Sequence, residues 1–136
     1  MRWTFVPAAR RVWVPVTVEG PQQAHTFRFL LDTGSSMTSM RAEFLRLLGF
    51  NPVAATRRRR MRSATGSVTA PILTVPRLIS LGQSRSDFEI AAHDPPPAIT
   101  ADGLLGLDFF RGLVLTLDFA RGRISLKSPR WWQLWH

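Results

Sequence analysis

The sequence predicts a mainly β domain, a barrel or a sandwich of short strands with one or two short helices. Two observations indicate this fold class. The 9 glycines and 10 prolines are spread along 136 residues and leave few long helical patterns between them. The intervening apolar runs have the length of strands, and turn signals separate them roughly every 8–12 residues, as in barrels and sandwiches. A chain of this length suits one domain with one core.

Composition narrows the classes of function. With 45% hydrophobic residues, the chain is not a disordered one. It has no cysteine, which excludes disulfides, cysteine-ligated zinc and a thiol nucleophile. His25, His93 and His136 are too far apart in sequence to form a metal-binding pair, so we expect neither a metal nor a cofactor. The net charge of +9 makes nucleic acid or an anionic membrane a partner to consider.

The termini bear on localisation and on domain boundaries. Residues 1–11 carry charges but lack the apolar stretch of a secretory signal, and no apolar run is long enough to span a bilayer. We therefore expect a cytoplasmic protein, or a fragment whose anchor lies outside this sequence. The chain divides into an N-terminal arm (1–11), a folded domain (12–127) and a Trp-rich tail (128–136).

Two strands are expected near the start of the domain. Residues 13–18 form the first, and Pro15 favours an edge position because proline has no N–H to donate to a neighbour. A turn at 19–21 leads to the second strand over 26–31, which is apolar on both faces at its end and is therefore expected to be buried. Residues 32–36 form the next turn.

One helix is expected, over residues 41–48. Ser39 is its predicted N-cap and Gly49 its end. The apolar residues expected to share its buried face are Phe44, Leu47 and Leu48.

The second half of the chain predicts hairpins. Residues 56–75 form two strands around Ala64-Thr65-Gly66-Ser67. The other expected elements are strands over 78–81 and 88–92, a stiff loop over 94–97, a helical turn over 108–111, and a hairpin of 113–118 with 123–126. Asp118 is expected to stabilise the turn of that last hairpin, and His25 and His93 are expected in loops.

The strongest chemical signal is Asp32-Thr33-Gly34-Ser35, directly after the apolar residues 29–31. An ionised carboxylate at the end of an apolar strand is costly to bury without partners. Gly34 allows a backbone N–H to approach the carboxylate, and the Ser35 hydroxyl offers a second donor. Such a loop holds a carboxylate in place for general acid–base catalysis. Taken alone, the motif also fits a buried Asp that closes a turn.

A second motif follows some 70 residues later, where Leu104-Leu105-Gly106 precedes the expected helical turn. The closing Leu117-Asp118-Phe119 and Arg123-Ile124-Ser125-Leu126 complete the pattern. In order and spacing, residues 12–127 resemble the retropepsin-like aspartic proteases, the single-domain relatives of pepsin. That resemblance implies a closed, barrel-like acid-protease fold, with one lobe per chain.

The resemblance also assigns roles to individual residues. It implies that Asp32 is the catalytic aspartate, that Thr33 bonds to the loop of a partner chain, and that Gly34 and Ser35 position the carboxylate. The implied substrate-binding flap tip is Thr65, Gly66 and Ser67, although it lacks the second glycine or the nearby aromatic residue of the family's pattern. Leu104-Leu105-Gly106 would pack beneath the active-site loop, and Asp108 would be structural.

A single Asp-Thr-Gly motif implies two chains. Aspartic-protease chemistry needs two carboxylates around one water, and two such groups share a proton because both cannot easily ionise. We therefore expect a homodimer in which each protomer supplies one Asp32 to cleave peptide bonds, across a two-fold interface. The alternatives are a weakly active or inactive module for dimerisation or peptide binding, and a basic nucleic-acid-binding protein, which would lack the usual aromatic stacking pattern.

Two features remain open. Arg57-Arg58-Arg59-Arg60, with Arg62, predicts either a preference for acidic peptides, nucleic acid or lipid, or a solvated edge whose like charges prevent aggregation. The second interpretation is favoured. The tail residues Trp131, Trp132, Leu134 and Trp135 suit a membrane interface or, as we prefer, packing against the barrel or a partner chain.

Overall fold

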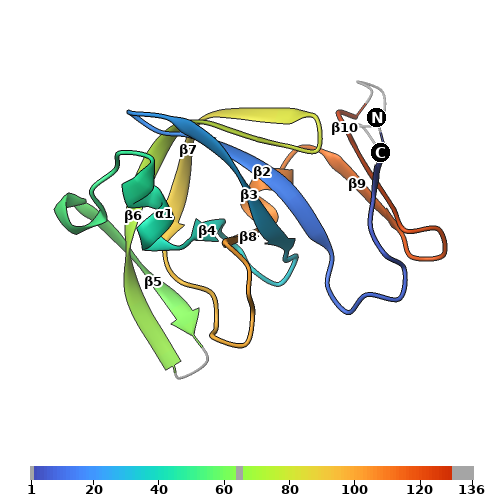
Figure 1. The fold of residues 1–136 in the computed structure, drawn as a ribbon, viewed down its shortest axis with the longest axis horizontal. Coiled ribbons are helices and arrows are strands. Elements are labelled where there is room, and N and C mark those ends of the chain that lie inside the picture. Colours follow the sequence, from blue (N-terminus) through green and yellow to red (C-terminus); the bar gives the residue numbers. More distant parts are fainter. Residues whose placement is uncertain (1, 64–65, 130–136) are drawn as a thin grey trace.

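The computed structural model describes residues 2–63 and 66–129 (Figure 1). The predicted mainly β fold with two short α-helices is confirmed. Its centre is a closed ring of six hydrogen-bonded strands in the order β2-β3-β8-β4-β7-β6, which the pairing of β2 with β6 completes. These strands are β2 (Trp13–Glu19), β3 (Ala24–Leu31), β4 (Ser39–Met40), β6 (Gly66–Ser80), β7 (Gln83–Ala92) and β8 (Gly103–Leu105). The chain therefore forms the predicted barrel.

The first strand of the barrel shows how the sequence pattern selects a face. Val14, Val16 and Val18 alternate along β2 and are buried, as period-two apolar residues are in a strand with one face on a core. β2 pairs with β6 only through residues 17–19. β2 is therefore not the edge strand that Pro15 predicted. Pro15 lies outside the section paired with β6, so its missing N–H is tolerated there.

The hairpin of β6 and β7 differs from the prediction. Residues 78–81 do not form a separate strand, because β6 continues to Ser80 and turns directly into β7. The turn consists of Leu81 (φ 52°) and Gly82 (φ 76°). A turn with two positive φ values normally contains Asn-Gly or Gly-Gly. Because this turn begins with leucine, its sequence did not identify it as a hairpin turn. Leu81 is buried, which explains why an apolar residue occupies this position.

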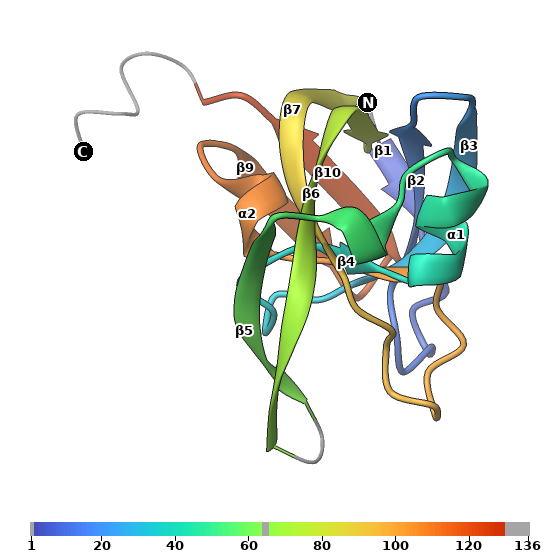
Figure 2. The ribbon, with the colours of Figure 1, turned by 90° about the vertical axis from the view of Figure 1, so that its left-hand side faces the viewer.

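The predicted hairpin around residues 64–67 is present. β5 (Arg57–Ser63) pairs with the first part of β6, from Arg57 opposite Ile72 to Ser63 opposite Gly66. The two strands extend together away from the barrel (Figure 2). Ala64 and Thr65 lie outside the described residues.

The helix prediction is correct in position but not in its cap or its whole buried face. α1 (Ala42–Leu47) follows Arg41, which makes no side-chain capping bond. Ser39 is not the N-cap, because it belongs to β4 and is buried there. Leu47 is 58% exposed, and Leu45 is buried instead. Gly49 does end the helix, with φ at 101° and its N–H bonded to the Arg46 carbonyl at 3.0 Å. A short 3₁₀ helix, η1 (Pro52–Ala54), follows.

A second, three-stranded sheet flanks the barrel. Its order is β1-β10-β9, with β1 (Arg2–Thr4), β10 (Arg123–Lys127) and β9 (Val114–Asp118). The predicted hairpin of β9 and β10 is confirmed. β1 was not predicted, because three residues of the N-terminal arm are too few to show a strand pattern. α2 (Leu107–Phe110) lies between β8 and β9 in the chain.

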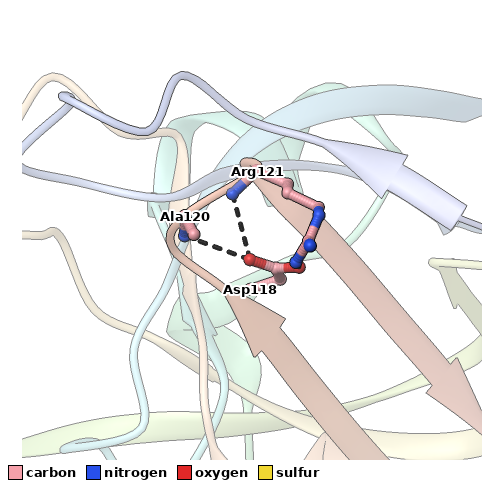
Figure 3. A network of polar contacts seen from close by, with 3 residues as sticks. All are labelled: Asp118, Ala120 and Arg121. Carbon is pink, nitrogen blue, oxygen red and sulfur yellow. Dashed lines mark hydrogen bonds and ion pairs between the residues drawn. The ribbon is translucent and has the colours of Figure 1, made fainter.

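Asp118 stabilises the β9–β10 turn as predicted (Figure 3). Its Oδ1 accepts the N–H groups of Ala120 and Arg121, each at 3.0 Å, and its Oδ2 accepts Nη1 of Arg121 at 3.1 Å. These donors, above all the Arg121 N–H, lower the pKa of the Asp118 carboxyl. Both carboxylate oxygens of Asp118 therefore accept hydrogen bonds within the turn, which supports a structural role.

His25 and His93 differ in their placement. His25 is not in a loop but in β3, with its ring edge against Phe27 at 4.9 Å between centroids. His93 does lie in a loop, after β7.

Within the described residues, no helix is both long and apolar enough to cross a membrane. The Trp131, Trp132, Leu134 and Trp135 tail lies outside the described part of the chain.

Candidate active site

Asp32 lies where two parallel strands of the barrel end together. It follows Leu31 of β3, which pairs with Leu105 of β8. Its backbone N–H donates to the Leu105 carbonyl at 2.9 Å. The carboxylate therefore starts from a backbone fixed to two strands, while the next residues leave the sheet as a loop.

Two backbone hydrogen bonds shape that loop. The Gly34 N–H donates to Oδ1 of Asp32 at 3.0 Å, as the motif predicts, and the Ser35 N–H donates to the Asp32 carbonyl at 3.1 Å. A Cβ on Gly34 would lie 3.2 Å from Oδ1, closer than most side chains come to a neighbour. A small residue at position 34 is therefore part of how the carboxylate is held.

The predicted role of the Ser35 hydroxyl is wrong. Ser35 Oγ donates its one proton to the Met37 carbonyl at 2.9 Å, which leaves no proton for the carboxylate. The hydroxyl instead braces the chain two residues further on. In the single chain, Asp32 is half-buried, and Thr33 and Gly34 are exposed beside it.

A buried clamp ties this loop to α2. Oγ1 of Thr38 donates to Oδ1 of Asp108 at 2.7 Å and accepts the Gly106 N–H at 3.1 Å. The Thr38 N–H also reaches both carboxylate oxygens of Asp108, at 3.0 and 3.1 Å. The Leu107 N–H donates to the Ser35 carbonyl at 2.8 Å. Leu104-Leu105-Gly106 thus lies against the active-site loop, and Asp108 has the structural place expected of it.

A cleft of about 720 Å³ opens beside Asp32. Three segments face one another across it: the Asp32 loop with β4, the strand β5, and the loop after β7. The lining residues are Asp32, Gly34–Met37, Ser39, Arg59–Arg62, His93–Pro97 and Leu104. Within residues 2–63 and 66–129, no group of three or more His, Asp or Glu is placed to hold a metal ion.

The match to known proteins agrees with this geometry. The sequence profile of a family described as "Aspartyl protease" matches residues 14–109, which include the Asp32 loop, the β5–β6 hairpin and Gly106. The chain belongs to the aspartyl protease family. A search among curated proteins finds no match.

The fold of this aspartyl protease is shared with a solved bacterial structure. The crystal structure of a retropepsin-like aspartic protease from Rickettsia conorii superposes with a TM-score of 0.70 at 17% identity, over 94% of this chain and 89% of that one. The likeness confirms the predicted acid-protease lobe.

Several residues around the protease cleft did not stand out in the sequence. Thr38 and Ser39 follow a turn within a polar stretch, and only their burial sets them apart. The Ser39 hydroxyl is buried beside the cleft with no hydrogen-bond partner among the described residues. His93 and the prolines after it were expected only as loop residues. Of the predicted flap tip, Gly66 and Ser67 are exposed at the end of the hairpin, and Thr65 lies outside the described residues.

Proposed function

We propose that this chain is an aspartic endopeptidase that acts as a homodimer. The observation that carries the proposal is the Asp32 loop, which presents one carboxylate to a cleft in a chain of the aspartyl protease family. The second carboxylate of the reaction comes from Asp32 of a second copy. Localisation in the cytoplasm remains our expectation for this enzyme.

The chemistry uses the two carboxyls in different protonation states. The ionised Asp32 takes a proton from a water molecule, whose oxygen attacks the carbonyl carbon of the peptide bond. The protonated Asp32 of the other copy donates to the carbonyl oxygen. The Asp32 that took the proton of the water then passes it to the amide nitrogen, the C–N bond breaks and the amine leaves. The other Asp32 regains its proton from a hydroxyl of the intermediate, which becomes the new carboxyl group. Because the two groups share one proton, the dyad titrates with macroscopic pKa values that belong to the pair.

The residues around Asp32 support its role. The Gly34 N–H on Oδ1 fixes one carboxylate oxygen, so the other is left to face the water. Thr33 is exposed next to it, and we expect its hydroxyl to bond to the partner's loop. A two-fold axis beside this exposed edge would bring the same surface of both protomers together, as an isologous interface requires.

An extended peptide fits the open side of the cleft. The β5–β6 hairpin would close over it as a flap, with Thr65, Gly66 and Ser67 at the tip. Extended peptides bind such sites by strand-like pairing with the backbone, while side-chain pockets select the sequence.

The direct test is Asp32→Asn, a nearly isosteric change that removes the titrating group. Cleavage of an unstructured peptide mixture, followed by mass spectrometry, is expected to disappear. Circular dichroism and the mass in solution should stay those of a folded dimer. Persistent cleavage by the variant, or full activity of a strictly monomeric wild type, would refute the proposal. Peptide binding by the wild type without cleavage would favour the non-catalytic binding module instead.

A further inference from the structure

The arginine run of β5 lies on the cleft. Arg59, Arg60 and Arg62 line it together with Asp32 on the other side. We call these three residues the cleft arginines. β5 is the edge strand of its sheet, which suits the aggregation-preventing interpretation favoured from the sequence. That interpretation does not explain why three of the arginines also line the cleft.

The five arginines of the run differ in their surroundings. Arg57 forms an ion pair with Glu89. All five are exposed, and Arg58 is not among the residues that line the cleft. Arg59 is opposite Ala70 in the hairpin register, and paired residues share a face of the sheet. Since Ala70 is 2% exposed, Arg59 lies on the inner face of the hairpin, whereas Arg60 and Arg62 lie on the other face, with Arg58. Arg59 is therefore the main candidate among the cleft arginines.

Arg59 has most of its hydrogen-bonding capacity unused. Its Nη1 approaches Sδ of Met37 at 3.6 Å, and a thioether is only a weak acceptor. Within the described residues, no carboxylate forms an ion pair with any cleft arginine. A guanidinium offers its donors in a planar fork that matches a carboxylate, so an acidic side chain bound in the cleft can pair with it.

We propose that the cleft arginines bind acidic side chains of the substrate, so that the preferred peptides carry Asp or Glu close to the cleaved bond. This inference rests on the proposed function and specifies its substrate. Because a homodimer places one copy of the arginines on each side of a two-fold axis, acidic residues on both sides of the bond are favoured.

The lining favours a peptide over nucleic acid as the occupant. Besides the arginines, the cleft presents the carboxylates of Asp32 and Asp94, which repel a chain with a phosphate at every nucleotide more than a peptide with single acidic side chains. Its apolar part consists of Met37, Met61, Leu104 and prolines 95–97. Among the described lining residues there is no Phe or Trp on which bases could stack.

The test uses pairs of fluorogenic peptides that share the residues at the cleaved bond and differ only in flanking Glu or Gln. For the wild-type dimer, we expect kcat/KM to be about three- to fivefold higher for the Glu peptides at low salt, with a smaller ratio at high salt. Arg59→Gln should bring this ratio close to one, and Arg59→Glu should reverse it in favour of flanking Lys. Arg58→Gln is the matched control, because it removes the same charge from the neighbouring residue outside the cleft. It should keep the ratio.

Binding separates this inference from the proposed function. The Asp32→Asn dimer should bind Glu peptides more tightly than Gln peptides by a similar factor, whether or not the wild type cleaves them. Equal binding and equal cleavage of the two peptides would overturn the inference, as would an Arg58→Gln effect as large as that of Arg59→Gln.

A single-stranded oligonucleotide is the competing ligand. If it binds more tightly than the acidic peptides and this binding depends on Arg59, the arginines belong to a nucleic-acid site. A wild type that binds acidic peptides selectively but cleaves nothing would overturn only the proposed function. Thermal unfolding of each variant verifies that it is folded.

Discussion

The hydroxyl of Thr38 does two things at once at a fully buried position. It donates to Asp108 and accepts from the Gly106 N–H, and so connects the loop after Asp32 to the start of α2. Hydrogen bonds of this kind contribute little net energy while they are made, but a buried group that loses its partner pays its full desolvation cost. The clamp therefore holds the Asp32 loop firmly from beneath, without touching the carboxylate of Asp32 itself.

Thr38→Val is expected to weaken both the fold and catalysis. Valine keeps the shape but leaves the Gly106 N–H without its acceptor and one Asp108 oxygen without the hydroxyl, at a cost of about 1–3 kcal/mol in the free energy of unfolding. Urea unfolding measures that loss, and kcat/KM for peptide cleavage should fall with it. The control is Thr17→Val, which breaks an exposed hydroxyl pair with Thr26 at 2.7 Å and should change stability by less than about 0.5 kcal/mol. Equal losses of unfolding free energy in the two variants would show that the buried Thr38 hydroxyl contributes no more than an exposed one.

Some of the contacts at this site could be predicted from the sequence and others could not. The Asp32–Gly34 bond spans two positions and follows from the motif itself. The Thr38–Asp108 bond joins residues 70 positions apart, and only the fold brings them together. The Ser35 hydroxyl had two acceptors within reach of a short loop, and its choice of Met37 over Asp32 depends on a backbone path that the residue types alone do not determine.

The ends of elements were predictable where a local rule decides them. Gly49 ends α1 because the chain needs a positive φ there, and glycine meets that need without strain. The β6–β7 turn needs the same geometry but uses Leu81, whose burial offsets the unfavourable backbone. Tertiary packing overrode turn chemistry at that position. β4 escaped prediction because a strand of two residues, here Ser39–Met40, has no alternation to show.

Gly106 joins β8 to α2 at a contact that has no room for a side chain. A Cβ there would lie 2.8 Å from both the Ser35 carbonyl oxygen and the Met37 carbonyl carbon, and backbone atoms cannot turn aside as a flexible side chain does. Its φ of −93° suits any residue, so the requirement for glycine comes from the close approach alone. Gly106→Ala should therefore displace the catalytic loop, lowering both kcat/KM and the free energy of unfolding, the latter by about 1–3 kcal/mol.

Gly82→Ala is the matched comparison for this element. Gly82 has a positive φ of 76° and nothing within 4 Å of a built Cβ, so its substitution costs roughly 1–2 kcal/mol of backbone strain. That strain is confined to the β6–β7 turn, and activity per folded molecule should remain that of the wild type. Unfolding in urea together with cleavage assays distinguishes the two variants. A Gly106→Ala enzyme as active as Gly82→Ala would show that the loop tolerates the displacement.

At the scale of the whole chain, the pattern of short strands predicted a mainly β fold but did not distinguish a barrel from a sandwich. The acid-protease lobe came from a resemblance: the Asp32 motif, the hairpin and Leu104-Leu105-Gly106 follow one another as they do in the retropepsin-like aspartic proteases. The parallel pairings of β3 with β8 and of β4 with β7 join segments far apart in sequence and have no local signature. The same holds for β1, which pairs with β10 at the other end of the chain.

The expected homodimer predicts a specific result when active and inactive chains are mixed. If each site needs Asp32 from both protomers, then only dimers of two wild-type chains cleave peptides efficiently. After subunit exchange in an equal mixture of wild type and Asp32→Asn, such dimers make up about one quarter of all dimers, so the rate should fall to about one quarter of that of the same total concentration of wild type. Sites complete within one chain would instead retain about half, since half of the chains are unchanged. The measurement is the initial rate of peptide cleavage across mixing ratios, which should follow the square of the wild-type fraction rather than a straight line. A mixture assayed at once, before the subunits exchange, serves as the control and should retain about half of the rate, because the original dimers are still intact.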